Sequence, residues 1–139
     1  AQTATVGAIR VDAGPAAAKG AGEQARVVAA ILDAELRREF AGRMAKGGPT
    51  LVVSVHSIWL NNNSVGRGDD EYGTGGASDY LETTGVLVGP RGQELARHTI
   101  LSPVPSSSTM LWSPEQDRLR FQALATHNAG WMRRYMLSN

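Results

Sequence analysis

The chain has 139 residues, 42% hydrophobic and 19% charged, so it fits one globular domain with its own core rather than a disordered chain. The 14 basic and 13 acidic residues leave a net charge of +1, and their mixture along the chain argues against a nucleic-acid partner. The absence of cysteine excludes disulfides and thiolate chemistry, and no apolar run approaches the roughly 20 residues of a membrane span.

The first predicted elements are a strand and a long helix. Residues 5–11 predict the strand, which ends before the turn-forming residues Asp12 and Gly14. An Ala/Gly-rich connection over residues 16–22 leads to a helix over residues 23–45, which a Gly-Gly-Pro sequence ends. Its apolar side chains recur every fourth residue, at Val28, Leu32, Leu36, Phe40 and Met44. This stripe predicts a helix that packs on the core.

Three strands are predicted next. Residues 51–60 are apolar on both faces, which is typical of a strand that is covered on both sides or central in its sheet. Residues 80–88 and 94–101 flank a Gly-Pro-Arg-Gly turn and predict an antiparallel hairpin, which Pro103 and Pro105 end. On the first of these strands, alternation places Leu51, Val53, Val55 and Trp59 on one face and Val52, Ile58 and Leu60 on the other.

The last predicted element is a helix over residues 114–136. Ser113 is a good N-cap and Pro114 suits the first helical position. Asn128 falls within the apolar face, which is formed by Phe121, Leu124, Ala125, Trp131, Met132, Tyr135 and Met136. We expect Trp131 in the core and Trp59 in the packing of the sheet.

The element order β-α-β-β-β-α predicts an α+β fold. A crossover helix lets the first two strands lie parallel, whereas the hairpin continues the sheet with antiparallel strands. Each helix has one apolar stripe, so both are expected on the same face of a four-stranded mixed sheet, as a two-layer sandwich. One domain over residues 1–139 would then contain two flexible loops, at residues 61–78 and 103–112.

Residues 61–78 are the main candidate for function. They contain five glycines and almost no apolar side chain, so their order must come from a partner, an ion or local hydrogen bonds. We expect a partner-binding site there and at the exposed end of the neighbouring loop, formed by Arg67, Asp69, Asp70, Tyr72 and Trp112.

Two alternatives remain open. An enzyme or a metal site could be assembled from His56, His98 and the acidic residues 69–71, if the fold brings them together across the sheet. A small-ligand site could instead use a cleft beside Trp59 or Trp112. No catalytic motif, nucleotide-binding loop or paired metal ligand occurs in the sequence, so we expect no enzymatic activity and no cofactor.

The element order and the stretch of residues 80–101 resemble the lipopolysaccharide-assembly lipoprotein family and related uncharacterised periplasmic lipoproteins. The small residues at positions 1–4 are typical of a chain cleaved from a signal peptide. The lipid-bearing cysteine of such lipoproteins is absent, and no functional residue carries over. The resemblance implies a non-enzymatic accessory protein, exported to the periplasm or the outer membrane, that binds an envelope protein or another envelope component.

Overall fold

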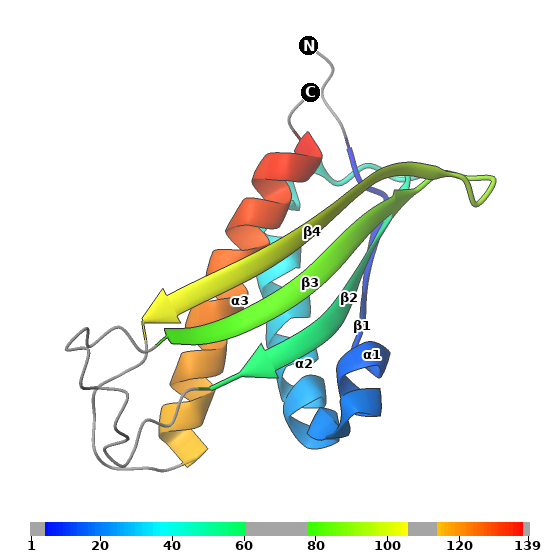
Figure 1. The fold of residues 1–139 in the computed structure, drawn as a ribbon. Helices are drawn as coiled ribbons and strands as arrows, with labels where there is room; N and C mark the ends of the chain where they lie inside the picture. Colours follow the sequence, from blue (N-terminus) through cyan, green and yellow to red (C-terminus); the bar gives the residue numbers. More distant parts are fainter. Residues whose placement is uncertain (1–4, 61–77, 106–113, 138–139) are drawn as a thin grey trace.

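The computed structural model describes residues 5–60, 78–105 and 114–137 (Figure 1). Their elements follow the predicted order β-α-β-β-β-α. In chain order they are β1 (Ala8–Asp12), α1 (Gly14–Ala16), η1 (Ala17–Ala21), α2 (Gly22–Glu39), η2 (Ala41–Arg43), β2 (Thr50–Trp59), β3 (Ser78–Val88), β4 (Glu94–Pro105) and α3 (Pro114–Leu137).

The four strands form one mixed sheet in the order β1-β2-β3-β4. β1 pairs with β2 in parallel, with Ile9 opposite Leu51, and the other two pairings are antiparallel. The predicted hairpin is confirmed, and Gly92 has the positive φ of 81° that its turn requires. β2 is central, as its apolar character indicated, whereas β1 and β4 are the edges of the sheet.

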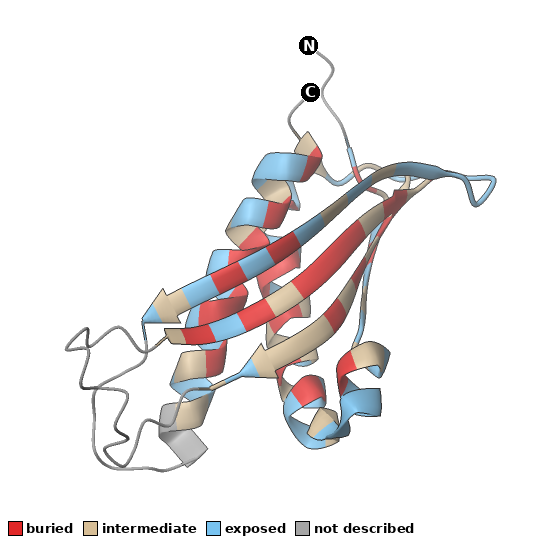
Figure 2. Cartoon of the chain, in the orientation of Figure 1, coloured by how far each residue is buried: buried red, intermediate tan, exposed pale blue. Residues whose placement is uncertain are grey.

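Helices α2 and α3 lie side by side behind the sheet, on one of its faces (Figure 1). Figure 2 shows buried residues on β2, β3 and β4 and on the two helices behind them. The α+β sandwich with two helices on one face is therefore confirmed. Its most deeply buried side chains include Leu32, Leu36, Phe40, Leu51, Val53, Val55, Leu81, Leu124 and Met132.

The first helix is shorter than predicted, and the connection before it is helical. α2 ends at Glu39 rather than at residue 45, and η2 follows it. The backbone near Met44 instead pairs with Val6, whose N–H donates to the Arg43 carbonyl and whose carbonyl accepts from Ala45. This competing pairing, beside a helix-weakening glycine at position 42, ends the apolar stripe at Phe40.

A register shift in β2 corrects the predicted faces of that strand. The pairing with β3 is irregular between Val55 and Ser57, so the alternation reverses there. Ile58 packs against the core, whereas Trp59, expected on the same face as Val55, lies on the uncovered face and is 62% exposed. Strict alternation could not reveal this bulge.

β4 continues through the two prolines that were predicted to end it. Pro103 is opposite Tyr80 and Pro105 is opposite Ser78 in the antiparallel pairing with β3. A proline is tolerated in an edge strand when its nitrogen faces away from the neighbouring strand. The prolines therefore identify β4 as an edge rather than marking its end.

Polar contacts position the helices against the sheet. The Asp79 carboxylate at the start of β3 accepts two hydrogen bonds from Arg120 of α3, at 2.7 and 2.9 Å, and both side chains are largely buried. Hydrogen bonding of the Arg120 guanidinium to the Asp79 carboxylate is the main reason that the pKa of Arg120 is raised. At the β1 edge of the sheet, Arg37 of α2 donates to the carbonyl oxygen of Ile9.

Asn128 lies within the apolar face of α3, as predicted, and is fully buried. Its amide oxygen accepts from Thr83 Oγ1 at 2.8 Å, and its amide nitrogen donates to Ser102 Oγ at 3.0 Å. Gly85 of β3 allows α3 to lie this close, because a Cβ there would overlap Met132. The amide therefore ties α3 to both strands of the hairpin.

We expect Asn128→Ala to lower the free energy of unfolding by about 1–3 kcal/mol, because it leaves two buried hydroxyls without their partner. Urea denaturation of the wild type and the variant measures the loss. Adding Thr83→Val and Ser102→Ala to Asn128→Ala removes both hydroxyls and should recover part of the stability. If the triple variant is less stable than Asn128→Ala, the unpaired hydroxyls are not the cause.

Candidate functional site: a groove between β4 and α3

One face of α3 carries a row of rings that do not enter the core. His127, Trp131 and Tyr135 are spaced four residues apart, so they lie on one side of the helix. Trp131 is 36% exposed and Tyr135 is exposed as well, which corrects the prediction that both belong to the core face. The buried stripe is narrower and consists of Phe121, Leu124, Ala125, Asn128, Ala129, Met132 and Met136.

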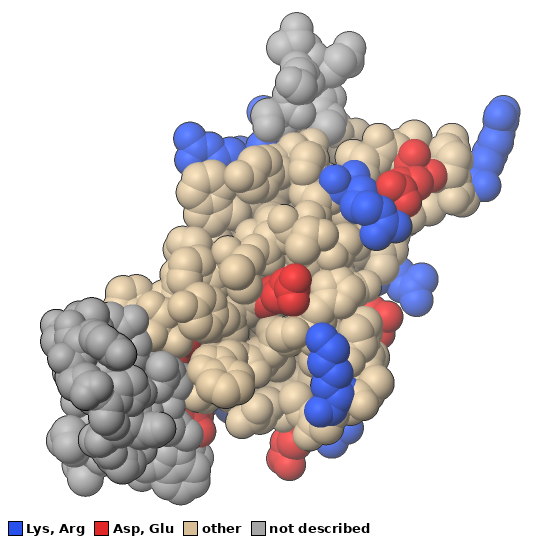
Figure 3. Space-filling model, viewed as in Figure 1, with Lys and Arg blue, Asp and Glu red and all other residues tan. Residues whose placement is uncertain are grey.

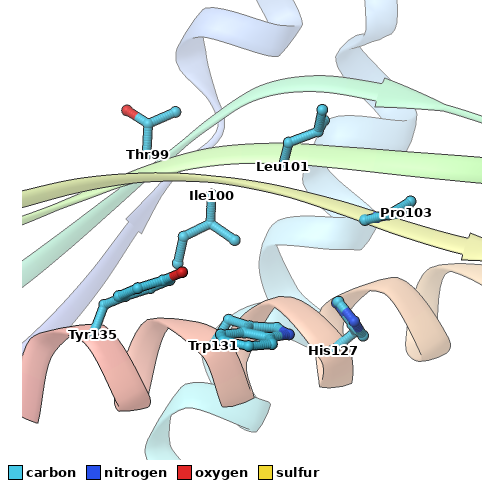
Figure 4. A pocket seen from close by; sticks show the side chains of 7 residues that line it. All are labelled: Thr99, Ile100, Leu101, Pro103, His127, Trp131 and Tyr135. Carbon is cyan, nitrogen blue, oxygen red and sulfur yellow. The ribbon is translucent and has the colours of Figure 1, made fainter.

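These rings face strand β4 across an open groove. Figure 4 shows His127, Trp131 and Tyr135 projecting from α3 on one side, while Thr99, Leu101 and Pro103 belong to β4 on the other. Ile100 points from β4 toward the helix layer and closes the bottom. The groove has a volume of about 360 Å³ and opens to solvent, a shape that suits an extended chain better than an enclosed small ligand.

The rings form a continuous stack along the groove. His98 of β4 stacks on Tyr135 with ring centroids 5.3 Å apart, and Tyr135 stacks on Trp131 at 5.6 Å. His127 contacts the other side of Trp131 at 6.4 Å, and the guanidinium of Arg134 lies 5.0 Å from the Trp131 ring centroid. Rings held by their neighbours lose little conformational entropy on binding, which is why such aromatic groups anchor interfaces.

The segments around the groove are basic. Residues 95–105 and 121–137 contain Arg97, Arg133 and Arg134 but no aspartate or glutamate. Glu94 pairs with Arg97, and Arg133 donates to the carbonyl oxygen of Glu39 and lies 4.0 Å from its carboxylate, so neighbouring carboxylates offset both of these charges. Arg134 lies over the Trp131 ring, and there it favours a ligand that carries negative charge.

The uncovered face of the sheet is a second exposed surface, continuous with the groove at Leu101. Figure 3 views this face and shows scattered charges with an uncharged area between them. Trp59 pairs with Tyr80, and both side chains are exposed. Nearby, His56 Nε2 lies 2.8 Å from Thr84 Oγ1, which in turn lies 2.9 Å from Thr99 Oγ1.

The predicted histidine pair is not brought together. His56 lies on the uncovered face, where it contacts Thr84, whereas His98 lies on the helix-facing side, where it stacks on Tyr135. The expectation that the two rings could face each other is wrong, because the sheet separates them. In residues 5–60, 78–105 and 114–137 no group of three or more His, Asp or Glu side chains is placed to hold a metal ion.

The other predicted site residues stay predictions. Arg67, Asp69, Asp70 and Tyr72, with the acidic alternative at residues 69–71, lie outside the described residues, as does Trp112. Trp59 is described, and its exposed side chain lies on the uncovered face of the sheet. The groove uses Trp131 instead, a residue that the sequence placed in the core.

A sequence signal for the groove exists in the spacing of α3. The rings at positions 127, 131 and 135 lie about 100° around the helix from the stripe at positions 128, 132 and 136. In the sequence, these two stripes cannot be told apart and together form one wide apolar face. Only the position of β4 determines which stripe is covered.

The chain was compared with known families, curated proteins and solved structures. No model of a known protein family matches the chain, and no curated protein matches it in sequence. The crystal structure of protein XCC0632 from Xanthomonas campestris, of family DUF330, matches 78% of the chain with a TM-score of 0.55 at 17% identity, and the chain covers 61% of that protein. A candidate lipoprotein from Caulobacter crescentus matches 79% of the chain, which covers 77% of that protein, with a TM-score of 0.46 at 15% identity.

The likeness to the Xanthomonas protein concerns the fold alone. At 17% identity, the Xanthomonas structure shows that a bacterial protein of an uncharacterised family has the same arrangement of strands and helices. Among the described parts of the chain, no helix is long and apolar enough to cross a membrane.

Proposed function

We propose that this chain is a non-enzymatic accessory protein of the bacterial cell envelope, which binds another protein or an envelope component in the groove between β4 and α3. The observation that carries the proposal is the stack of His98, Tyr135 and Trp131 beside an edge strand. A solvent-facing row of aromatic rings is typical of the centre of a binding surface.

The geometry supports binding rather than catalysis. The groove is walled by rings and aliphatic side chains, and the two histidines near it contact aromatic rings. A general base needs an acceptor position aimed at a substrate and a partner that orients it. The location in the envelope rests on the resemblance in element order to envelope lipoproteins, and the fold shared with a bacterial protein agrees with it.

Photo-cross-linking at position 131 tests the proposal. We expect a photoreactive residue at position 131 to give a discrete cross-linked product in the native host, because this position lies in the groove. The same residue at position 119 is the control, since Leu119 is an exposed position of α3 that does not line the groove. Mass spectrometry of the product identifies the partner.

The identified partner then permits a quantitative measurement. We expect Trp131→Ala to weaken binding of that partner by about tenfold or more, as loss of a central aromatic anchor does. Leu119→Ala should leave the affinity unchanged, because Leu119 is exposed and does not line the groove. Affinities are compared below the melting temperature of each variant, because Trp131 also packs against its neighbouring rings. Equal cross-linking at positions 131 and 119, or equal affinity of the two variants, would contradict the proposal.

A further inference from the structure

We propose that the groove takes its partner as an extended, acidic segment of another protein, which adds to the sheet beside β4 as a fifth strand. This inference rests on the proposed function and specifies how the partner binds. It follows from three properties of the groove: the direction of the backbone groups of β4, the side chains that flank them, and the local charge.

The free edge of β4 offers backbone hydrogen-bonding groups. Within the described residues β4 pairs only with β3. In an antiparallel strand the N–H and C=O groups of alternate residues point to opposite sides. Pro103 and Pro105 both lie at odd positions, and a paired edge strand tolerates proline where the nitrogen faces outward. The same parity directs the N–H and C=O groups of Thr99 and Leu101 away from β3.

The prolines also limit where a fifth strand can pair. Positions 103 and 105 have no N–H to donate, so the outward donors of β4 lie at the odd positions from 97 to 101. Those positions run alongside the groove, whose lining includes Thr99 and Leu101. Backbone pairing and aromatic contact are thus available over the same short length of β4.

Side chains of an added strand would alternate between two environments. Those that point toward the helix layer meet Trp131 and Tyr135, with Ile100 beneath them. Those that point the other way lie beside Leu101 and Thr99 on the uncovered face. An extended peptide with apolar residues at every second position fits this arrangement, and it is the pattern by which edge strands recognise peptides.

The charge beside the groove favours an acidic segment of another protein over a second copy of this chain. In a second copy joined edge to edge, the side chains of β4 on the helix-facing side would be those of His98, Ile100 and Ser102, none of which is a carboxylate that could meet Arg134. A partner segment with an aspartate or glutamate beside its apolar residues would instead be attracted toward Arg134, which lies over Trp131. We therefore assign the site to an acidic segment of a different protein.

A selection from a phage-displayed library of short random peptides provides the probe. We expect the selected peptides to have apolar residues at every second position and at least one acidic residue, and to bind Trp131→Ala more weakly than the wild type. A helical spacing of apolar residues, an excess of basic residues, or no peptide that depends on Trp131 would overturn the proposal.

Two changes then separate backbone pairing from side-chain contact. Leu101→Pro removes an outward N–H at an odd position of β4, and the strand already has prolines at two odd positions, 103 and 105. Leu101→Ala shortens the same side chain and keeps the N–H. We expect Leu101→Pro to weaken a selected peptide by about three- to tenfold more than Leu101→Ala does, the effect of one backbone hydrogen bond. Backbone N-methylation of the peptide at alternate residues should cause a similar loss, and it requires no folded variant.

The remaining outcomes are distinguishable. If Leu101→Pro and Leu101→Ala bind the peptide with equal affinity, and N-methylation does not change that affinity, the partner does not bind as a strand. The proposed function still stands in that case if Trp131→Ala weakens binding of the cross-linked partner. If Trp131→Ala affects neither partner nor peptide, both proposals fail. Self-association in sedimentation that Leu101→Pro abolishes would assign the edge to a second copy and overturn the choice of partner.

Discussion

Phe40→Ala is expected to lower the free energy of unfolding by about 3–5 kcal/mol, the loss typical of a large buried aromatic side chain. Phe40 is 0% exposed and lies where α2 ends. Its removal leaves a cavity between the helix layer and the sheet, and close-packed surroundings collapse only partly into such a space. Urea denaturation at constant m-value measures the loss.

Met44→Ala is the matched control for Phe40→Ala. The sequence places both residues in one apolar stripe, four residues apart, but the structure separates them, and Met44 is 38% exposed. We expect Met44→Ala to cost less than about 1 kcal/mol, as partly exposed positions do. Leu36→Ala, one turn before Phe40 and fully buried, should cost about 2–5 kcal/mol. Equal losses at positions 40 and 44 would mean that α2 continues past Glu39.

Asp79→Ala is expected to cost about 3–5 kcal/mol, because it removes the carboxylate that accepts two hydrogen bonds from the buried guanidinium of Arg120 and leaves Asp117, at 3.8 Å, as the neighbouring carboxylate. Arg120 donates two hydrogen bonds to Asp79, and the pair joins the start of β3 to α3. The raised pKa of Arg120 means that its contribution to stability is fully present below the ordinary pKa of an arginine side chain. It is lost only as the pH rises through the higher folded-state value, so we expect the loss in Asp79→Ala to be constant around neutral pH.

Asp33→Ala provides the comparison for Asp79→Ala. Asp33 and Arg37 form an ion pair one turn apart on α2, at 3.0 Å, and both side chains are substantially exposed. An exposed helical pair contributes about 0.3–0.5 kcal/mol, so Asp33→Ala should change stability little. Replacing Asp79 and Arg120 together by leucine, with Asp117→Asn so that no carboxylate loses its neighbouring cation, should recover part of the loss. If Asp79→Ala and Asp33→Ala cost the same, the Asp79–Arg120 pair is hydrated in solution.

The fold could be predicted because its determinants are local. The four-residue spacing from Val28 to Phe40 indicates an amphipathic helix, and the turn at residues 89–92 indicates a hairpin. The predictions that failed concern contacts between distant segments. Pairing of Val6 with Met44 ends the helix early, and the bulge after Val55 exposes Trp59.

The groove was missed for the same reason. Trp131 and Tyr135 have the composition and spacing of core residues, and whether they are covered depends on where β4 lies beside α3. The prolines at positions 103 and 105 were interpreted as a strand end, although in an edge strand they are compatible with pairing. A sequence shows that a strand exists, but its place in the sheet follows from the assembled topology.

The hydrogen bond from Arg37 to Ile9 has a consequence for the stoichiometry of assembly. Growth of a filament through sheet edges requires two receptive edges on every molecule. At β1 the strand is short and Arg37 already occupies the carbonyl oxygen of Ile9, whereas no second strand among the described residues pairs with the odd positions of β4. Addition can therefore proceed in one direction only. Once a partner strand has joined β4, this molecule offers no second edge for further addition, and the product is a finite complex rather than a fibre.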